Sequence, residues 1–226
     1  MSNDELGRVI RARSLGRAWV AAVRTILLEG HEASYEAQPI LEIARLDLVV
    51  ENPGDVDGII ERSGDPERIA WMRANFRDRT PVDELGGAAS YATRLYDYES
   101  RGRDQVAWVT ERLRADPSCR SAVITMLQPL SDAAYIPCVS LLHFWRPKES
   151  LELLVTAHSI DFGTKGYANL LELAQVQSCV AASLCLPAGR LIFRVTSAHV
   201  YERDLAAMRR LVTSEDSRSR EHPLPS

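Results

Sequence analysis

Cys138 is followed along the chain by polar residues at distances that together suit the handling of a pyrimidine ring. Asp161 and Asn169 lie 23 and 31 residues downstream of it, and His199 and Tyr201 lie 61 and 63 residues downstream. A pyrimidine is a poor carbon nucleophile at C5, and addition of a thiolate to C6 turns C5 into an enolate or enamine carbon that can attack an electrophile. An unpaired cysteine is usually a small buried hydrophobe, so it is the whole set that favours catalysis by Cys138.

The other members of this set have side chains suited to a nucleotide, and each also has an ordinary structural interpretation. The Asn169 amide carries a donor and an acceptor that can pair with the N3 and O4 edge of a uracil, although a helical asparagine more often makes a structural hydrogen bond. His199 and Tyr201, two apart on a predicted strand, point to one face and can grip a ribose hydroxyl together. Asp161 precedes a small-residue turn, where a carboxylate can also cap a helix. Arg120 can hold a phosphate, or it can be an exposed arginine without a ligand.

The elements that must position these residues predict an α+β fold with a mostly antiparallel or mixed sheet. Apolar residues at helical spacing predict helices at 15–28, 66–79, 84–98 and 104–114, and a long apolar helix at 164–186 that suits the middle of the core. Strand-like apolar runs occupy 40–50, 121–127, 138–145, 151–158 and 191–201. The polar stretch that follows predicts a disordered tail at 213–226, which leaves 1–212 as a single domain.

Composition narrows the class of protein. The chain has 226 residues, 46% hydrophobic and 26% charged, which is enough for one substantial core. Its beginning has no apolar targeting segment and its apolar stretches are interrupted by polar residues, so we expect a cytoplasmic protein without a membrane span. The four cysteines lack CxxC spacing and nearby paired histidines, which argues against a metal site. A net charge of −4 argues against nucleic acid as the main ligand, although a local arginine cluster can still hold an anion.

Taken together, these residues and their spacing resemble the thymidylate synthase and deoxycytidylate hydroxymethylase superfamily, and the chain looks like a compact, divergent member. The resemblance runs from about residue 104 to residue 201 and needs no gap after Cys138. The matching motifs are Asp104-Gln105, Asp116-Pro-Ser-Cys-Arg120, Pro137-Cys138, Ser159-Ile-Asp161 with the downstream Asn169, and Ala198-His-Val-Tyr201. The fold that this resemblance implies is a mixed sheet with a long buried central helix, paired through the sheet into a homodimer.

The resemblance also implies a role for each matching residue. Cys138 would be the nucleophile, Asn169 would read the base edge, and His199 with Tyr201 would bind the sugar 3′-hydroxyl. Ser159 would help to hold the phosphate. The family's one-carbon donor is 5,10-methylene-tetrahydrofolate, and Asp161 would contact its pterin. Arg120 would bind the phosphate in the partner's site. The implied substrate is a pyrimidine nucleotide of the uridylate or cytidylate type.

The chain departs from the family's phosphate clamp. His158 stands directly before Ser159 where the family has an arginine, Ser121 takes the place of another, and residues 30–38 contain none. Each lost charge-assisted contact is worth about 1.5–3 kcal/mol, so monophosphate binding would weaken unless other groups such as Arg94 or Arg146 replace them. His158 remains a candidate substrate contact.

Two further positions are candidates for chemistry. Glu67, in Pro66-Glu-Arg-Ile-Ala-Trp71, is our candidate for the glutamate that manages protons at the pyrimidine, although its offset from Trp71 differs by one residue from the family pattern. Lys165, one of only two lysines, is placed to contact the folate or to replace a phosphate contact. The polar tail lacks the apolar segment that closes over folate in the family, and a site that admits water would favour hydroxymethylation.

Three functions therefore stand beside one another. The leading hypothesis is folate-dependent C5 methylation of a pyrimidine nucleotide through a covalent bond between Cys138 and C6. The first alternative is a CMP or dCMP 5-hydroxymethylase, for example in nucleoside antibiotic formation. The second is a non-catalytic paralogue that binds a nucleotide or a partner subunit. The sequence leaves open the base, the sugar and the product.

Overall fold

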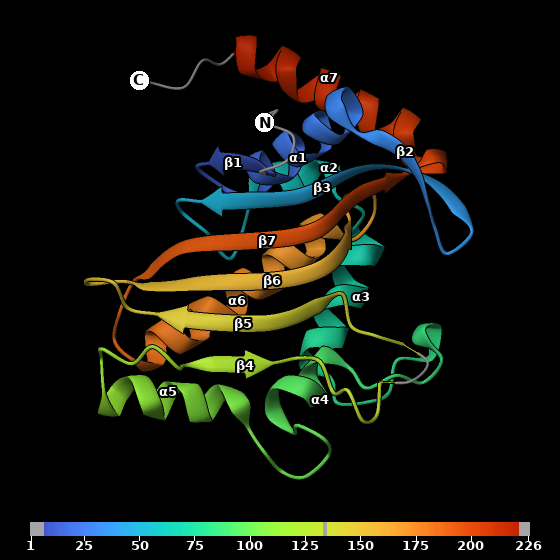
Figure 1. Ribbon diagram of the computed structural model, residues 1–226. Helices are drawn as coiled ribbons and strands as arrows, with labels where there is room; N and C mark the ends of the chain where they lie inside the picture. The colour runs from blue at the N-terminus through green and yellow to red at the C-terminus, as the bar shows by residue number, and fades with distance from the viewer. Residues whose placement is uncertain (1–6, 133–134, 222–226) are drawn as a thin grey trace.

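A seven-stranded mixed sheet forms the centre of the computed structural model, which describes residues 7–132 and 135–221 (Figure 1). The strand order is β1-β3-β7-β6-β5-β4, and β2 pairs with β3 outside this path. The β1–β3 and β6–β7 pairs are parallel and the others are antiparallel. The strands are β1 (Arg8–Ala12), β2 (His31–Tyr35), β3 (Gln38–Val50), β4 (Val123–Thr125), β5 (Val139–Trp145), β6 (Leu151–Asp161) and β7 (Ala188–Tyr201).

Helices cover one face of this sheet. The described helices are α1 (Leu15–Glu29), α2 (Gly58–Ser63), α3 (Pro66–Arg77), α4 (Tyr91–Tyr96), α5 (Gln105–Ala115), α6 (Gly166–Ser183) and α7 (Leu205–Glu221), with short 3-10 turns η2 (Asp83–Leu85) and η3 (Glu202–Asp204). Helices α1 and α6 lie directly on the sheet, and α7 packs on α1. Figure 1 shows α6 passing behind β6 and β5, whereas no helix is drawn in front of β7, β6 and β5. The structure confirms the expected α+β fold with a mixed sheet and a long central helix.

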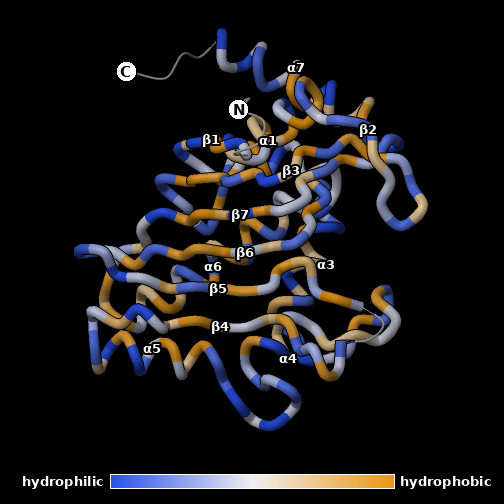
Figure 2. The backbone as a smooth tube through the Cα atoms, viewed as in Figure 1, coloured by the Kyte–Doolittle hydropathy of each residue, from blue (hydrophilic) through white to orange (hydrophobic). Residues whose placement is uncertain are grey.

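The burial pattern follows from side-chain periodicity. Helix α6 is buried on most of its surface, packing against α1, α3, β6 and β7, as expected of a helix that is apolar nearly all round. On β5, Leu142 and Phe144 are fully buried while Leu141, His143 and Trp145 alternate with them toward the uncovered face. Figure 2 shows the same concentration of apolar residues along the central strands.

The predicted helix at 84–98 is wrong in one respect, because the structure divides it into η2 and α4. Gly86 and Gly87 lie between them with φ values of 67° and 78°, in the left-handed region that a right-handed helix cannot use. The long helix also ends at Ser183 rather than 186, and Cys185 adopts a φ of 56° shortly after it.

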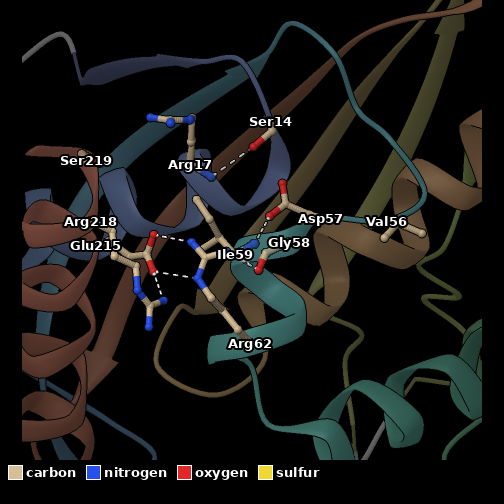
Figure 3. A pocket seen from close by; sticks show the side chains of 10 residues that line it. All are labelled: Ser14, Arg17, Val56, Asp57, Gly58, Ile59, Arg62, Glu215, Arg218 and Ser219. Carbon is tan, nitrogen blue, oxygen red and sulfur yellow. Dashed lines mark hydrogen bonds and ion pairs between the residues drawn. The ribbon is translucent and has the colours of Figure 1, made fainter. Parts of the chain in front are cut away.

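The expectation of a disordered tail is wrong for residues 213–221, which form the second half of α7. Glu215 there is buried and pairs with Arg62 at 2.7 Å and with Arg218 at 3.1 Å. Figure 3 shows these three side chains together at a surface cavity of about 670 Å³. Ion pairing to another helix thus orders a segment whose sequence is polar. The remaining residues, 222–226, lie outside the described part of the chain.

Asp57 joins two helix starts beside the same cavity. Its Oδ2 accepts a hydrogen bond from the Gly16 amide at 2.9 Å, and its Oδ1 accepts from the amides of Ile59 at 2.9 Å and Ile60 at 3.3 Å. The carboxylate is buried and therefore satisfies donors at the N-termini of both α1 and α2. Gly16 is needed for this approach, since a Cβ there would lie 2.1 Å from Asp57 Oδ1.

We expect the substitution Asp57→Ala to lower the free energy of unfolding by about 2–3 kcal/mol, because it removes a cap from two helices and leaves buried amides without acceptors. Asp65→Ala is the matched control, since Asp65 caps only α3, at an exposed position, and should cost about 1 kcal/mol. Urea unfolding of both variants measures the difference. Equal losses in the two variants would contradict the shared-cap interpretation.

Candidate active site

Cys138 is held by its backbone at the point where β5 begins. Its carbonyl oxygen accepts a hydrogen bond from the His158 amide at 3.0 Å, and the amide of Val139 donates to the Tyr91 hydroxyl at 3.2 Å. The pairing of Val139 with Ala157 therefore continues by one residue, which places Cys138 opposite His158 on the neighbouring strand. Cys138 is partly buried against the core.

Tyrosines and two charged groups surround the Cys138 thiol. Burial raises its pKa, the positive charge of Lys165 and a hydrogen bond with Tyr135 lower it, and the negative charge of Glu36 raises it. Burial also raises the pKa values of the nearby phenols Tyr91 and Tyr135. These hydroxyls therefore remain neutral donors or acceptors at neutral pH.

The parallel pairing of β6 with β7 brings the other predicted residues together. Ser159 lies opposite Ser197 and Asp161 lies opposite His199. Ser159 Oγ is 3.4 Å from His199 Nδ1, and the His199 ring packs at 5.2 Å, edge on, against that of Tyr201. Burial lowers the pKa of His199, so the imidazole is neutral at neutral pH.

His199 also has a free polar atom. It is only 2% exposed, and its Nε2 has no hydrogen-bond partner among the described residues. A buried polar atom without a partner is costly, which suits a contact to a ligand hydroxyl. Burial, Glu36 and Asp161 raise the pKa of the adjacent Tyr201 to about 12, so its hydroxyl remains protonated beside the imidazole.

Two further candidates, Lys165 and Asn169, follow Asp161 at intervals of four residues from the end of β6 into α6. The Lys165 amide donates to the Asp161 carbonyl at 3.1 Å, and the Asn169 amide donates to the Lys165 carbonyl at 2.9 Å. Asn169 is 3% exposed; its Nδ2 donates to Lys165 O at 3.1 Å, while its Oδ1 finds no partner within 7–132 and 135–221. That oxygen is available to accept a hydrogen bond from a ligand.

The β2–β3 hairpin supplies two residues that sequence reasoning missed. Tyr35 packs its ring 5.4 Å from that of His199, and burial and the negative charges of Glu36 and Cys138 raise the pKa of its phenol. The turn uses Glu36 and Ala37 with φ values of 50° and 58°, where such hairpin turns usually have glycine or asparagine. No turn residue therefore signalled this hairpin. Tyr91 and Tyr135 were missed for a similar reason, since nothing in their local sequence indicates contact with Cys138.

The structure thus brings most of the predicted site residues into one cluster. Its members are Cys138, His158, Ser159, Asp161, Lys165, Asn169, His199 and Tyr201, joined by the contacts described above. Glu67 lies on the exposed first turn of α3. It is one helical turn before Trp71, whose ring is 5.6 Å from Lys165 Nζ. The assignment of Glu67 as a proton-handling group stays a prediction.

Two of the arginines considered as phosphate ligands, Arg120 and Arg146, lie far from Cys138. The Arg120 guanidinium lies 5.7 Å from the Trp145 ring, and its carbonyl oxygen is 3.0 Å from His143 Nε2. Trp145 is seven residues along the strand from Cys138, a span of roughly 20 Å, so Arg120 is outside this chain's own cluster. Arg146 lies beyond the same distant end of β5 and its Nη2 donates to Glu149 at 3.4 Å, so it too is outside this chain's own cluster.

The suggestion that Arg94 replaces a phosphate ligand is wrong. Its side chain is 1% exposed and forms a two-point ion pair with Asp132, with N–O distances of 2.7 and 2.8 Å. The guanidinium also donates to the carbonyl oxygens of Ala89 and Met126. All three of its nitrogens therefore already have protein partners.

Comparison with known proteins places this site in a family. The family model described as thymidylate synthase matches residues 65–223. The chain belongs to the thymidylate synthase family. The matched segment contains all eight members of the cluster around Cys138, whereas Tyr35 and Glu36 of the β2–β3 hairpin lie outside it.

Two relatives of this thymidylate synthase family member cover most of its length, and a third covers about half. It is 29% identical over 208 residues to a protein of Methanosarcina acetivorans named "Putative thymidylate synthase", covering 88% of this chain and 92% of the relative. A protein of the same name from Methanopyrus kandleri is 30% identical over 201 residues, with 87% and 94% covered. The bifunctional dihydrofolate reductase-thymidylate synthase of Leishmania amazonensis is 28% identical over 125 residues, which is 54% of this chain and 24% of that protein.

Thymidylate synthases use methylene-tetrahydrofolate as co-substrate, and the residues beside Asp161 suit such a ligand. A Cβ at Gly163 would lie 3.1 Å from Asp161 Oδ1 and 3.2 Å from Asp204 Cβ, so a larger residue would crowd both aspartates and require them to shift by a few tenths of an ångström. Asp204 Oδ2 is buried without a hydrogen bond in the described structure, and Arg203 Nε lies 3.6 Å from it in an ion pair. Burial and Asp161 raise the Asp204 pKa, and Arg203 lowers it. Two carboxyl groups with accepting oxygens fit the N–H edge of a pterin.

The described helices give no sign of a membrane span, since none of them is both long and apolar enough to cross a bilayer.

Proposed function

We propose that this protein transfers the one-carbon unit of methylene-tetrahydrofolate to C5 of a pyrimidine nucleotide while Cys138 is bonded to C6. The observation that supports this most strongly is the presence of two buried polar atoms without a partner in the described structure, Asn169 Oδ1 and His199 Nε2. They belong to the same cluster as Cys138, whose carbonyl oxygen accepts from the amide of His158, the neighbour of the residue that contacts His199. Each of the two unpartnered atoms needs a ligand group to satisfy it. Methylation of a uracil nucleotide is the leading form of the proposal.

The residues have separable tasks in this reaction. The Cys138 thiolate forms the S–C6 bond, and the electron pair of the C5–C6 double bond moves toward C5 and O4. Asn169 Oδ1 accepts a hydrogen bond from a base N–H, and His199 with Tyr201 binds the sugar hydroxyl. The co-substrate supplies the carbon that C5 attacks. For a methyl product, the co-substrate would also supply a hydride to the transferred carbon and leave as dihydrofolate; for a hydroxymethyl product, water would add to that carbon and tetrahydrofolate would leave. Loss of the C5 proton and cleavage of the S–C6 bond then restore the thiolate and the C5–C6 double bond of the ring.

A cytosine substrate with a hydroxymethyl product is the second candidate, because the unpartnered atom of the Asn169 amide is its acceptor oxygen. An acceptor can receive the N4 amino group of a cytosine as well as the N3–H of a uracil. A CMP or dCMP 5-hydroxymethylase, for example in nucleoside antibiotic formation, would use the same cluster. Glu67 is proposed to manage the proton at C5, and Ser159 and His158 to contact the nucleotide beside Cys138.

The test is incubation of the purified protein with methylene-tetrahydrofolate and each of UMP, dUMP, CMP and dCMP, followed by mass spectrometry of the nucleotides. A gain of one methyl group on a uracil nucleotide supports the leading form. A gain of one hydroxymethyl group on a cytosine nucleotide supports the second. No gain on any of the four contradicts both and favours a nucleotide-binding paralogue.

We further propose a homodimer in which Arg120 serves the partner's site. The face of the sheet that no described helix covers carries Leu141, Trp145 and Ile192, and Arg120 lies against Trp145 on the same face. A two-fold interface there would place Arg120 beside a second copy of the chain. As part of the proposed function, we also expect a pyrimidine nucleotide as the ligand and the cytoplasm as the location.

We expect a mixture of the inactive variants Arg120→Ala and Cys138→Ala to regain activity on subunit exchange. If each site takes Cys138 from one subunit and Arg120 from the other, equal mixing restores about a quarter of the wild-type activity. Steady-state assays before and after mild dissociation and reassociation measure this. Absence of any gain, with exchange verified by mass spectrometry, would contradict the shared site.

A further inference from the structure

Arg203 holds its guanidinium group over an aromatic ring of the cluster around Cys138. Its Cζ lies 4.4 Å from the centroid of the Tyr201 ring, and the His199 ring lies 5.2 Å from that ring, edge on. An aromatic face attracts a guanidinium placed over it, and the N–H donors at the edge of the planar group stay free to bind a ligand. Arg203 is therefore a cation fixed beside the two residues that are proposed to hold the sugar.

The β2–β3 hairpin holds the same guanidinium from a second side. Arg203 Nη1 donates to Gln38 Oε1. Gln38 is the cross-strand partner of Tyr35, whose ring lies 5.4 Å from that of His199. A cavity of about 300 Å³ lies at this junction of hairpin and β7, lined by Gln38, Pro39, Tyr201, Glu202 and Arg203.

Much of the positive charge of Arg203 remains available to a ligand. Its Nε lies 3.6 Å from Asp204 Oδ2, and because the two side chains are 57% and 23% exposed, water screens this ion pair, which is worth at most about 1 kcal/mol. Gln38 offers only a neutral amide oxygen, and the carboxylate of Glu202 is exposed. Within 7–132 and 135–221, Nη2 of Arg203 has no hydrogen-bond partner.

Other cations of this chain are poorly placed to meet a phosphate near the sugar. Residues 30–38 contain no arginine, and His158 is neutral at neutral pH because burial lowers its pKa. Arg94 is bound in a buried ion pair, and the Lys165 ammonium lies over a tryptophan ring of α3. Among the described residues, Arg203 is thus the cation whose side chain contacts a residue assigned to the sugar.

We propose that Arg203 binds the phosphate of the nucleotide substrate and so replaces part of the missing arginine clamp. This deepens the proposed function and rests on it, because that proposal places the sugar at His199 and Tyr201. The hydroxyl that Tyr201 holds and the phosphate are substituents of one sugar, so a cation over the Tyr201 ring is near both. Arg203 stays protonated throughout, and no bond forms or breaks at it.

The experiment is a titration followed by NMR, without folate, of UMP, dUMP, CMP, dCMP and the four matching nucleosides. We expect wild type to bind the nucleotide of its preferred base at least about tenfold more tightly than the nucleoside. In Arg203→Gln the nucleotide affinity should fall by about 10- to 100-fold, since one charge-assisted contact is lost, whereas the nucleoside affinity should stay within about twofold. Arg203→Lys keeps the charge and should recover part of the loss.

Arg210→Gln is the matched control, because it removes an exposed arginine from α7, and it should bind as wild type does. Circular dichroism verifies that each variant is folded. Unchanged nucleotide affinity in Arg203→Gln overturns the inference, as does an equal loss for nucleotide and nucleoside, which would mean that Arg203 only supports Tyr201. A wild type that does not prefer the nucleotide overturns it as well.

A carboxylate of the folate is the other anion that Arg203 could pair with, and a separate titration with methylene-tetrahydrofolate tests it. Weaker folate binding in Arg203→Gln, with nucleotide affinity unchanged, would assign the residue to the co-substrate and overturn the inference.

These titrations need no one-carbon transfer, so their result is separable from that of the product assay. A nucleotide preference that depends on Arg203, without transfer to any nucleotide, would remove the proposed reaction and leave the phosphate contact intact. One-carbon transfer by the wild-type protein, with an unchanged preference in Arg203→Gln, would remove the phosphate contact alone.

Discussion

Replacing Cys138 with alanine is expected to abolish one-carbon transfer, with a loss of about 10⁴-fold or more in turnover. The reason is that C5 of the pyrimidine becomes nucleophilic only while a thiolate is bonded to C6, and no other described cysteine lies within the site. Cys119 is buried elsewhere in the core, and Cys179 and Cys185 lie in and beyond the last turn of α6. The binding contacts of Asn169 and His199 should survive the substitution.

A covalent trap measures this directly. A 5-fluoropyrimidine nucleotide has no proton at C5 to lose, so with methylene-tetrahydrofolate it should leave an adduct on the intact protein that mass spectrometry detects. We expect the adduct in wild type and in the control Cys179→Ala, and none in Cys138→Ala. An adduct that persists in Cys138→Ala would assign the nucleophile to another residue. Its absence from the wild-type protein, with ribose and deoxyribose forms alike, would favour the non-catalytic paralogue.

Arg94→Met is expected to lower the free energy of unfolding by about 3–5 kcal/mol, because it leaves a buried carboxylate without its counter-charge. The side chains of Arg94 and Asp132 are 1% and 5% exposed. The ion pair also holds the segment between β4 and Cys138, since Asp132 Oδ2 accepts from the Gln128 amide at 2.7 Å and Arg94 donates to Met126 O at 2.8 Å. We therefore expect slower turnover in the fraction that remains folded.

Urea unfolding of Arg94→Met and of Arg194→Met compares the loss of a buried ion pair with the loss of an exposed one. Arg194 also pairs with an aspartate, Asp47, but its side chain is 57% exposed, so its loss should cost at most about 1 kcal/mol. The double variant Arg94→Met, Asp132→Leu should be more stable than Arg94→Met alone, because it removes the stranded carboxylate as well. Equal losses in Arg94→Met and Arg194→Met would contradict the assigned role.

Elements with a strong apolar period could be predicted, and elements stabilised by polar contacts could not. The strands at 138–145, 151–158 and 191–201 and the helix at 164–186 appear close to their expected bounds, because burial on one or both faces imposes a regular pattern. Strand β2 and the end of α7 have polar sequences. The first is held by backbone pairing to β3 and the second by the ion pair between Glu215 and Arg62, and neither leaves a periodic signal.

Arg94 illustrates the limit for single side chains. The sequence shows an arginine upstream of the site, and such a residue suits a phosphate as well as a carboxylate. Its partner Asp132 is 38 residues away, and no local pattern relates the two. Because Arg94 and Asp132 are both buried in the folded chain, Arg94 forms a structural ion pair and does not bind a phosphate.

The spacing of Cys138, Asp161, Asn169, His199 and Tyr201 was legible in the chain itself, because each lies at the end of a strand or the start of a helix whose period is visible. The surroundings of the thiol were not. Tyr35, Glu36, Tyr91 and Tyr135 act on the charge of the thiol from a hairpin, a helix start and an adjacent loop, and none of them was a candidate in the sequence. Coulombic and hydrogen-bonding effects depend on distance in space, so the protonation state of the nucleophile follows from how the sheet and its helices pack.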